Sequence, residues 1–231
     1  MLLVNKLVII TGANRGLGKA IADLALQDSA TCVISLSRAI HPSQQVLEAH
    51  RFKWIPLDLT QPFDEQILVQ VKNYLNRNSQ VWFFNNAGIV TPIAAVGELD
   101  PLAIAASIQV NVTFPAQCIN FLLALVKENP LTVINISSGA GVKPIAHWGI
   151  YCASKAFMKM YFKVLVEENS TNTQLKWFDI DPGVMDTGMQ ETIRQNEFPR
   201  QAYFSSLKNE EQLATPEIVA ARIFEQIAFN G

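Results

Sequence analysis

Short apolar segments alternate with longer amphipathic segments along most of the chain. Two of the short segments, at 81–84 and 133–136, are largely apolar on successive residues, which is typical of strands covered by helices on both faces. Parallel β-α-β units require this alternation. We therefore predict an α/β fold, a single domain over 1–231 with a doubly wound parallel sheet and helices on both faces. The pattern predicts strands at 7–11, 31–36, 52–56, 80–84, 131–136 and 175–180 and helices at 16–27, 63–77, 101–128, 150–168 and 216–228.

Two segments show no clear period. Residues 39–50 leave room for a short helix at most. Residues 185–214 are polar with scattered aromatic side chains, and we interpret this long irregular segment as a substrate lid. The pairs Asp-Pro at 100–101 and Thr-Pro at 215–216 each combine an N-cap residue with a proline at the first helical position. They predict where two of the helices begin.

The composition suits one large domain, because 49% of the 231 residues are apolar. The net charge is −2 and the basic residues are scattered, so we expect no contact with nucleic acid or a membrane surface. The first apolar run ends in a glycine turn without a cleavage site, which indicates a strand rather than a signal peptide. A small-molecule substrate is the default expectation.

The three cysteines and three histidines have no metal-ligand spacing, so we expect no metal site. An odd number of cysteines fits a reducing compartment, and we predict a cytoplasmic protein. The most apolar later stretch, 114–126, is too short to span a bilayer.

Tyr151 and Lys155 form a Tyr-x-x-x-Lys pair, and Tyr151 follows Ser138 by thirteen residues. On one helix, this separation places the tyrosine and the lysine on the same face, one turn apart. A nearby ammonium favours the phenolate and so lowers the pKa of tyrosine from about 10, which makes it a usable acid or base near neutral pH. By itself the pair is weak evidence, because an interfacial tyrosine beside a solvated lysine gives the same pattern.

A glycine-rich turn, Thr-Gly-Ala-Asn-Arg-Gly-Leu-Gly at 11–18, follows the first predicted strand and opens the first predicted helix. Glycines let the backbone approach a pyrophosphate, and the helix N-terminus offers free N–H groups and the positive end of its dipole. A tight turn without a ligand is the alternative. The predicted cofactor-binding residues of this turn are Gly12, Asn14, Arg15, Gly16, Leu17 and Gly18.

The second predicted strand ends in Ser37 and Arg38, where a fold that prefers NAD carries an acidic side chain against the ribose 2′-hydroxyl. Here the acid is absent. The planar guanidinium of Arg38 can pair with a 2′-phosphate, and Arg15 could reach the same group. Either arginine alone is more often a surface residue, but together, with the acid missing, they favour NADP(H) over NAD(H).

These residues together resemble the short-chain dehydrogenase/reductase family, and within it most closely the benzil reductase and sepiapterin reductase-like branch. The resemblance implies a Rossmann-type fold. It rests on ordered motifs over most of the chain: the glycine turn at 11–18, Asp-Leu at 58–59, Asn-Asn-Ala-Gly at 85–88, Asn111, Asn-Ile-Ser-Ser at 135–138, Tyr-Cys-Ala-Ser-Lys at 151–155 and Asp-Pro-Gly-Val-Met-Asp-Thr at 181–187.

The resemblance implies a role for each matching residue. Tyr151 is the implied general acid that protonates a carbonyl oxygen, and Lys155 depresses the pKa of Tyr151 and holds the nicotinamide ribose. Ser138 is implied to hydrogen-bond the substrate oxygen, and Asn111 to anchor a water that links Lys155 to solvent. The implied cofactor contacts are Asp58 and Leu59 beside the adenine, Asn85, Ala87 and Gly88 on the adenosine side, and Pro182, Gly183, Val184 and Thr187 around the nicotinamide.

We therefore expect an NADPH-dependent carbonyl reductase that transfers a hydride between nicotinamide and an apolar or aromatic ketone or diketone, or a sepiapterin-like carbonyl. His147, Trp148, Met185 and Met189 are the expected substrate-pocket residues. Two alternatives remain open. One is a non-catalytic NADP(H)-binding scaffold or redox sensor, and the other is an NAD-linked alcohol dehydrogenase.

The predicted helices at 101–128 and 150–168 are apolar over more than one face. A helix of this kind cannot bury all its apolar side chains against its own sheet, and two-fold pairing would cover the remainder. We therefore predict a homodimer. The sequence ends at 229–231, where members of the family usually continue into a seventh strand. Either the sheet has six strands or the sequence is incomplete.

Overall fold

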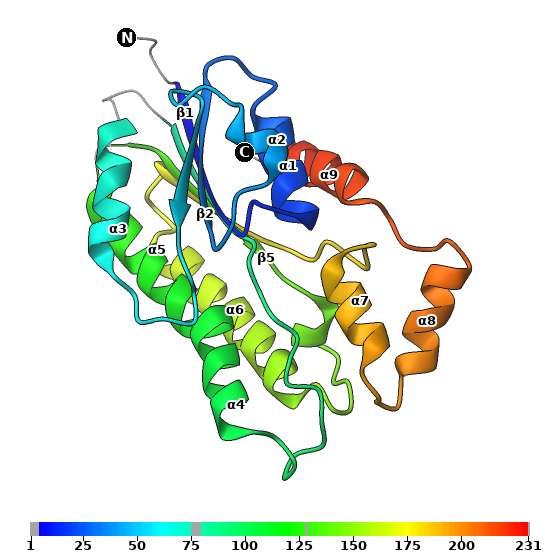
Figure 1. Ribbon diagram of the computed structural model, residues 1–231. Helices are drawn as coiled ribbons and strands as arrows, with labels where there is room; N and C mark the ends of the chain where they lie inside the picture. Colours follow the sequence, from blue (N-terminus) through cyan, green and yellow to red (C-terminus); the bar gives the residue numbers. More distant parts are fainter. Residues whose placement is uncertain (1–4, 75–79, 128, 231) are drawn as a thin grey trace.

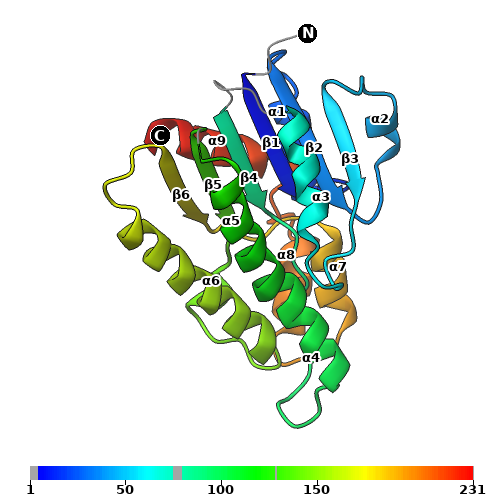
Figure 2. The same cartoon turned by 90° about the vertical axis from the view of Figure 1, so that its left-hand side faces the viewer.

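The computed structural model describes residues 5–74, 80–127 and 129–230. Their strands form one sheet (Figure 1), in which all neighbours pair in parallel, in the order β3-β2-β1-β4-β5-β6 (Figure 2). The predicted α/β fold is therefore confirmed, with six strands in the part of the chain that is described. The strands are β1 (Lys6–Thr11), β2 (Thr31–Ser37), β3 (Phe52–Pro56), β4 (Gln80–Asn85), β5 (Leu131–Ile136) and β6 (Leu175–Ile180).

Helices cover both faces of this sheet (Figure 2). Successive residues of β1 point to opposite faces, so Leu7 and Ile9 join one core and Val8 and Ile10 join the other. All four are fully buried, which explains why the central strands are apolar on successive residues. One face carries α3 (Glu65–Val69), α5 (Phe114–Leu125) and α6 (Gly149–Glu168), and the other carries α1 (Gly16–Ala25) and α9 (Pro216–Asn230).

The helix predicted at 101–128 is interrupted. It consists of α4 (Pro101–Ile108) and α5, joined by a π-helical turn over Gln109–Thr113. Pro115 has no backbone N–H to donate to the carbonyl of Asn111, four residues earlier, so regular α-helical bonding cannot continue there. The last predicted residue of this helix, at 128, lies outside the described part of the chain.

Two shorter elements also refine the prediction. The helix predicted at 63–77 is α3 followed by a 3-10 turn over Gln70–Tyr74, and 75–77 lie outside the described residues. A short helix, α2 (Pro42–Gln45), lies between β2 and β3, as the length of that segment predicts. Both predicted N-caps are present, because the side chains of Asp100 and Thr215 accept bonds from N–H groups three residues later, at 3.0 and 3.4 Å.

The segment 185–214 is helical, so the prediction of an irregular segment is wrong. It forms α7 (Gly188–Gln195) and α8 (Gln201–Asn209). Each helix is short and buries few side chains. The segment therefore has too few apolar positions to show a helical repeat in the sequence. The two ends of the segment are held together, because Met185 pairs with Ala214 and the N–H of Asp186 donates to the Ala214 carbonyl at 3.0 Å.

The strand order determines where a ligand can bind. The chain proceeds from β1 to β2 and β3 on one side, then crosses to β4, β5 and β6 on the other. The loops at the carboxyl ends of β1 and β4 therefore diverge, and ligands of doubly wound sheets bind in the crevice at this point.

Candidate active site

The turn between β1 and α1 has the backbone that its glycines allow. Gly12 and Gly16 have φ angles of 71° and 53°, in the left-handed region that favours glycine. A Cβ on Gly18 would lie 2.3 Å from the Gly12 carbonyl oxygen, so no side chain fits there. Arg15, the N-cap residue of α1, makes no side-chain cap bond, and the first turn carries no acidic residue. The free N–H groups and the positive end of the dipole thus remain available to an anion.

The chain that follows β4 packs directly on this turn. The side-chain amide of Asn86 donates to the Thr11 carbonyl at 2.9 Å, and the Thr11 hydroxyl accepts from the N–H groups of Asn86 and Ala87 at 3.0 and 2.9 Å. Asn86 was not among the predicted site residues, although it stands in the Asn-Asn-Ala-Gly motif. Its bonds hold the glycine turn against the end of β4.

A cleft of about 560 Å³ extends from the glycine turn to Tyr151 and Lys155. It lies at the carboxyl ends of the strands, where the topology places a ligand. Most of the predicted site residues line it: Gly12, Asn14, Arg15, Gly16, Leu17, Gly18, Ser37, Arg38, Asp58, Leu59, Ala87, Gly88, Ser138, Tyr151, Lys155, Pro182, Gly183, Met185, Thr187 and Met189.

Five predicted site residues do not line this cleft. Asn85 donates from its amide to the Asn135 side-chain oxygen at 2.7 Å, within the sheet. Trp148 is 4% exposed and packs against the ring of Tyr151 rather than facing the cleft. The five predicted site residues that do not line the cleft are Asn85, Asn111, His147, Trp148 and Val184.

Several residues that line the cleft were not among the predicted site residues. Four of them, Asn86, Ile136, Ser137 and Asp181, stand inside recognised motifs, so the motifs themselves could have indicated them. The rest follow strand ends or neighbour motif residues, and only the folded chain brings them together. The missed residues are Leu36, Ala39, Leu57, Thr60, Asn86, Ile89, Val110, Ile136, Ser137, Asp181 and Gly188.

Burial controls the acidity of Tyr151, which is 5% exposed. Burial raises the pKa of Tyr151 to about 12, the negative charge of Asp181 acts in the same direction, and a hydrogen bond with Ser138 opposes them. The lost hydration of the phenolate is the largest cause of this shift and Lys155 is not among its causes, so the lowering of the pKa by Lys155 stays a prediction. The side chain of Tyr151 is therefore protonated, and able to donate a proton, across the physiological pH range.

Lys155 is also buried, and its ammonium points to the backbone. Its Nζ donates to the Ile136 carbonyl at 2.8 Å and lies 5.7 Å from the centroid of the Tyr151 ring. Burial lowers the pKa of Lys155 to about 8, while the charges of Asp179 and Asp181 oppose that shift. At neutral pH Lys155 is thus mostly in its charged form, but it releases its proton more readily than an exposed lysine does.

Asn111 is held through both atoms of its amide. Its Oδ1 accepts from the N–H of Ile89 at 3.0 Å, and its Nδ2 donates to the Ile89 carbonyl at 2.8 Å. A Cβ on Gly88 would lie 3.3 Å from Asn111 Oδ1 and 3.9 Å from Lys155 Nζ. Asn111 and Lys155 therefore converge on Gly88, which lines the cleft, although Asn111 itself does not.

The other end of the cleft carries charged groups at the surface. Arg38 follows β2 and Asp58 follows β3, and both line the cleft. A hydrogen bond from the N–H of Thr60 lowers the pKa of Asp58, and the positive charge of Arg38 adds to this effect. The exposed side chain of Arg38 therefore lies at the end of the cleft opposite Tyr151.

An aromatic cluster packs behind Tyr151. The centroid of the Trp148 ring lies 5.7 Å from that of Tyr151, 5.5 Å from Phe198 and 5.2 Å from Phe204. Phe198 and Phe204 belong to the helical segment 185–214, which therefore packs on the start of α6. Met189 of α7 lies with its Sδ 4.0 Å from the Tyr151 hydroxyl.

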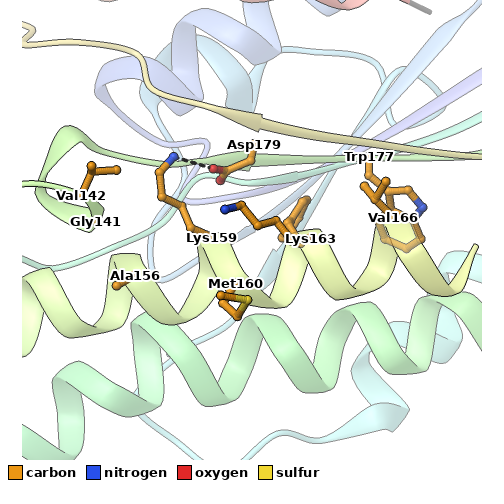
Figure 3. A pocket seen from close by; sticks show the side chains of 10 residues that line it. Gly141, Val142, Ala156, Lys159, Met160, Lys163, Val166, Trp177 and Asp179 are labelled. Atoms are coloured by element: carbon orange, nitrogen blue, oxygen red, sulfur yellow. Dashed lines mark hydrogen bonds and ion pairs between the residues drawn. The ribbon is translucent and has the colours of Figure 1, made fainter. Parts of the chain in front are cut away.

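A second cavity, of about 530 Å³, lies between α6 and the edge strand β6 (Figure 3). Lys159 and Asp179 line it and form an ion pair at 2.8 Å. Asp179 also accepts from the Asn135 side chain at 2.6 Å. The negative charge of Asp179 is thus compensated by a cation and a hydrogen-bond donor.

The comparisons with known proteins agree with this geometry. The family model described as short chain dehydrogenase matches residues 6–198. The chain belongs to the short-chain dehydrogenase family.

Two kinds of curated relative are similar to this short-chain dehydrogenase. A Bacillus cereus protein named benzil reductase ((S)-benzoin forming) is 34% identical over 94% of the chain and 91% of the relative. A Bos taurus sepiapterin reductase is 31% identical over 82% of the chain and 76% of the relative. Among solved structures, the crystal structure of the KRED1-Pglu enzyme has a TM-score of 0.84 at 27% identity, over 98% of this chain and 95% of that one. The benzil reductase and sepiapterin reductase-like branch named above is therefore confirmed.

As a member of this family, the protein is an oxidoreductase that acts on C=O or CH–OH groups with a nicotinamide cofactor. The residues present fit such a cofactor, since Gly18 leaves no room for a side chain and the start of α1 is open to a pyrophosphate. When bound, the cofactor supplies or accepts a hydride. The protein contributes the proton donor, the orientation and the electrostatics.

Proposed function

We propose that the protein is an NADPH-dependent carbonyl reductase of apolar or aromatic ketones and diketones. One observation carries the proposal: a single cleft joins the glycine turn and Arg38 to Tyr151, Ser138 and Lys155. A cofactor bound along this cleft would place its nicotinamide beside a buried proton donor, which hydride transfer to a carbonyl requires.

Tyr151 is the proposed general acid. Its pKa, raised to about 12 by burial, keeps the hydroxyl protonated until a carbonyl oxygen gains negative charge. Ser138, which hydrogen-bonds Tyr151, is proposed to hold the same substrate oxygen. Lys155 is proposed to hold the nicotinamide ribose, and Asn111 to anchor a water between Lys155 and solvent. The buried position of Asn111 beside Gly88 and Lys155 supports this role.

NADPH is proposed as the cofactor because of charge. Arg38 and Arg15 both line the cleft, and the end of β2 carries Ser37 where NAD-preferring folds carry an acid. Guanidinium groups that line the cleft would favour a ribose 2′-phosphate over a 2′-hydroxyl. The relevant experiment compares kcat/KM with NADPH and NADH.

An aromatic substrate is proposed because of the walls near Tyr151. Met185 and Met189 line the cleft there, and the cluster of Trp148, Phe198 and Phe204 packs behind Tyr151. Two of the relatives are named for benzil and sepiapterin, both of which carry a carbonyl on or beside a ring system. The segment 185–214, which supplies Met189 and two of the aromatic rings, is the proposed substrate lid.

The direct test is the reduction of benzil by the purified protein. The oxidation of NADPH is followed by absorbance at 340 nm, and the product is separated on a chiral column. We expect turnover with NADPH and formation of one benzoin enantiomer. Binding of NADPH without turnover on any aromatic diketone would instead support a non-catalytic scaffold. Turnover that is faster with NAD⁺ and an alcohol would support an NAD-linked alcohol dehydrogenase.

We propose a homodimer formed through α4, α5 and α6, which lie side by side on one face of the sheet (Figure 2). Their outer surface exposes large apolar side chains that two-fold pairing would bury. These are Leu102 at 80% exposure, Ile108 at 41%, Phe157 at 46%, Met160 at 60% and Val164 at 43%.

Light scattering coupled to gel filtration at micromolar protein tests the dimer. We expect a mass near twice 25.6 kDa. Phe157→Glu should give a monomer, whereas Val46→Glu, at an 84% exposed position after α2, should leave the mass unchanged. A wild-type protein at the monomer mass would refute the interface.

We propose a cytoplasmic location. Cys32 and Cys118 are buried free thiols, which suits a reducing compartment. Pro101–Leu125 is the one stretch, within the described residues, long and apolar enough to cross a membrane. Its inward side chains, among them Phe114 and Leu122, belong to the core beside the sheet. Fractionation of cells that express the full chain, with detection in the soluble fraction, tests this location.

A further inference from the structure

Two carboxylates near the catalytic end of the cleft differ in their surroundings. Asp179, on β6, is paired with Lys159 at 2.8 Å (Figure 3). It also receives a hydrogen bond from the Asn135 side chain at 2.6 Å. Asp181 follows the end of β6 and lines the cleft. Among the described residues, no lysine, arginine or histidine lies within ion-pair distance of Asp181. Asp181 therefore has no salt bridge like that of Asp179, although its charge also acts on the more distant ammonium of Lys155.

The position of Asp181 is held by the backbone. Its Oδ1 accepts from the N–H of Gly183 at 3.1 Å. Its Oδ2 faces Gly139, on which a Cβ would lie 3.3 Å away. The first bond closes the turn at the start of the Pro-Gly segment. The second contact shows that a larger residue at 139 would push the carboxylate away.

The charges around Asp181 can be named element by element. Helix α6 contributes Tyr151, which is neutral, and Lys155, whose ammonium donates to the backbone of β5. Strand β6 contributes Asp179, which is paired with Lys159. The other acidic residue among those that line the cleft is Asp58, at the opposite end and near Arg38. Asp181 thus supplies the negative charge that lines the cleft at the Tyr151 end, where it acts on both Tyr151 and Lys155.

Hydride transfer changes the charge at that end. A hydrogen nucleus leaves the reduced nicotinamide with two electrons and bonds to the carbonyl carbon, and the carbonyl oxygen takes the proton of Tyr151. The nicotinamide ring, neutral when reduced, gains one positive charge when oxidised. A fixed negative charge nearby favours the oxidised ring and the transition state that leads to it.

We propose that Asp181 is an electrostatic residue that stabilises the oxidised, positively charged nicotinamide relative to the reduced ring. The inference rests on the proposed function, because it places the nicotinamide at the Tyr151 end of the cleft. It assigns Asp181 no proton transfer and no contact with substrate. Its effect is on the ratio of the affinities for the two forms of the cofactor, and hence on the direction of reaction.

The test is the pair of dissociation constants for NADP⁺ and NADPH, measured by calorimetry on wild type and on Asp181→Asn. An asparagine keeps the oxygen that accepts from Gly183, so the variant removes the charge and preserves the turn. We expect the affinity for NADP⁺ to fall about three- to tenfold, as for one charge at a partly solvated site, and that for NADPH to change less than about twofold. Asp181→Ala should shift the ratio in the same direction.

Asp58→Asn is the matched control, since it removes the same charge from the other end of the same cleft. It should change the two dissociation constants by the same factor. If Asp181→Asn also leaves their ratio unchanged, the role given to Asp181 is refuted while the proposed function stands. If wild type binds neither NADP⁺ nor NADPH, the proposed function is refuted, and this inference with it.

Discussion

The two ends of the cleft are built by different means. At the cofactor end, contiguous residues of the turn at 11–18 present backbone N–H groups, and Arg38 lies exposed beside them. At the catalytic end, the half-buried Ser138, the buried Tyr151 and the exposed Asp181 come from three separate segments and line the same part of the cleft. The first end depends on backbone conformation and the second on what surrounds each side chain.

This difference has an electrostatic consequence. Near Arg38 the charged side chains are exposed or half-buried and act by attraction. Near Tyr151 the loss of hydration dominates, and burial moves the pKa values of Tyr151 and Lys155 toward the neutral forms. Substitutions should therefore change cofactor affinity at the first end, and rate or pH dependence at the second.

The largest effect is expected at the catalytic end. Tyr151→Phe removes the proton donor and leaves the ring packing, so kcat should fall about a thousandfold, within the usual contribution of general acid catalysis. The dissociation constant for NADPH should change little. Tyr161→Phe, on the same helix and half-buried, is the control and should keep full activity. Normal turnover in Tyr151→Phe would remove the distinction between the two ends.

The next effect is expected at the cofactor end. In Gly18→Ala the new methyl group would lie 2.3 Å from the Gly12 carbonyl, so the turn must shift. We expect the affinity for NADPH to fall about a hundredfold, because the free N–H groups at the start of α1 lose their alignment. Gly149→Ala is the control, since its methyl group would meet Val96 at an ordinary 3.6 Å. Equal affinity in wild type and Gly18→Ala would contradict the pyrophosphate site.

A smaller effect distinguishes the two cofactors. Arg38→Ala should lower kcat/KM with NADPH about tenfold more than with NADH, because a charge-assisted hydrogen bond contributes roughly 1.5–3 kcal/mol. Arg222→Ala, at an exposed position of α9, provides a control for the loss of a positive charge. An unchanged NADPH/NADH ratio in Arg38→Ala would place the 2′-phosphate elsewhere.

The smallest effect is on stability and tests burial at the catalytic end. The pKa of Lys155 is about 8 in the folded protein and 10.5 in its ordinary state, so between these values the unfolded chain binds more protons. The free energy of unfolding should therefore rise with pH from about 8 to 10, by at most about 2 kcal/mol. Above pH 10 the raised pKa of Tyr151 reverses the trend.

Urea unfolding at several pH values measures this stability, with Lys155→Met as the comparison. The variant should lose the rise between pH 8 and 10, because it has no proton to release. If wild type and Lys155→Met show the same pH dependence, Lys155 is not the buried charge that the structure indicates.

The sequence by itself determined the parts of this protein that depend on near neighbours. The strands were predicted to within one residue at each end, and both Pro-containing helix starts were located. The spacing of apolar residues, helix capping and the left-handed backbone conformation of glycine are local properties. The turn at 11–18 could therefore be predicted from its own residues. The order of the motifs along the chain was sufficient to indicate the family.

The tertiary structure alone decided how those parts act on one another. It formed two helices in 185–214 and placed Trp148 behind the ring of Tyr151. It also raised the pKa of Tyr151 through burial, and it paired Asp179 with Lys159 while leaving Asp181 without a salt bridge among the described residues. Hydration and ion pairing depend on residues far apart in the sequence, and the sequence pattern alone contains no record of those distances.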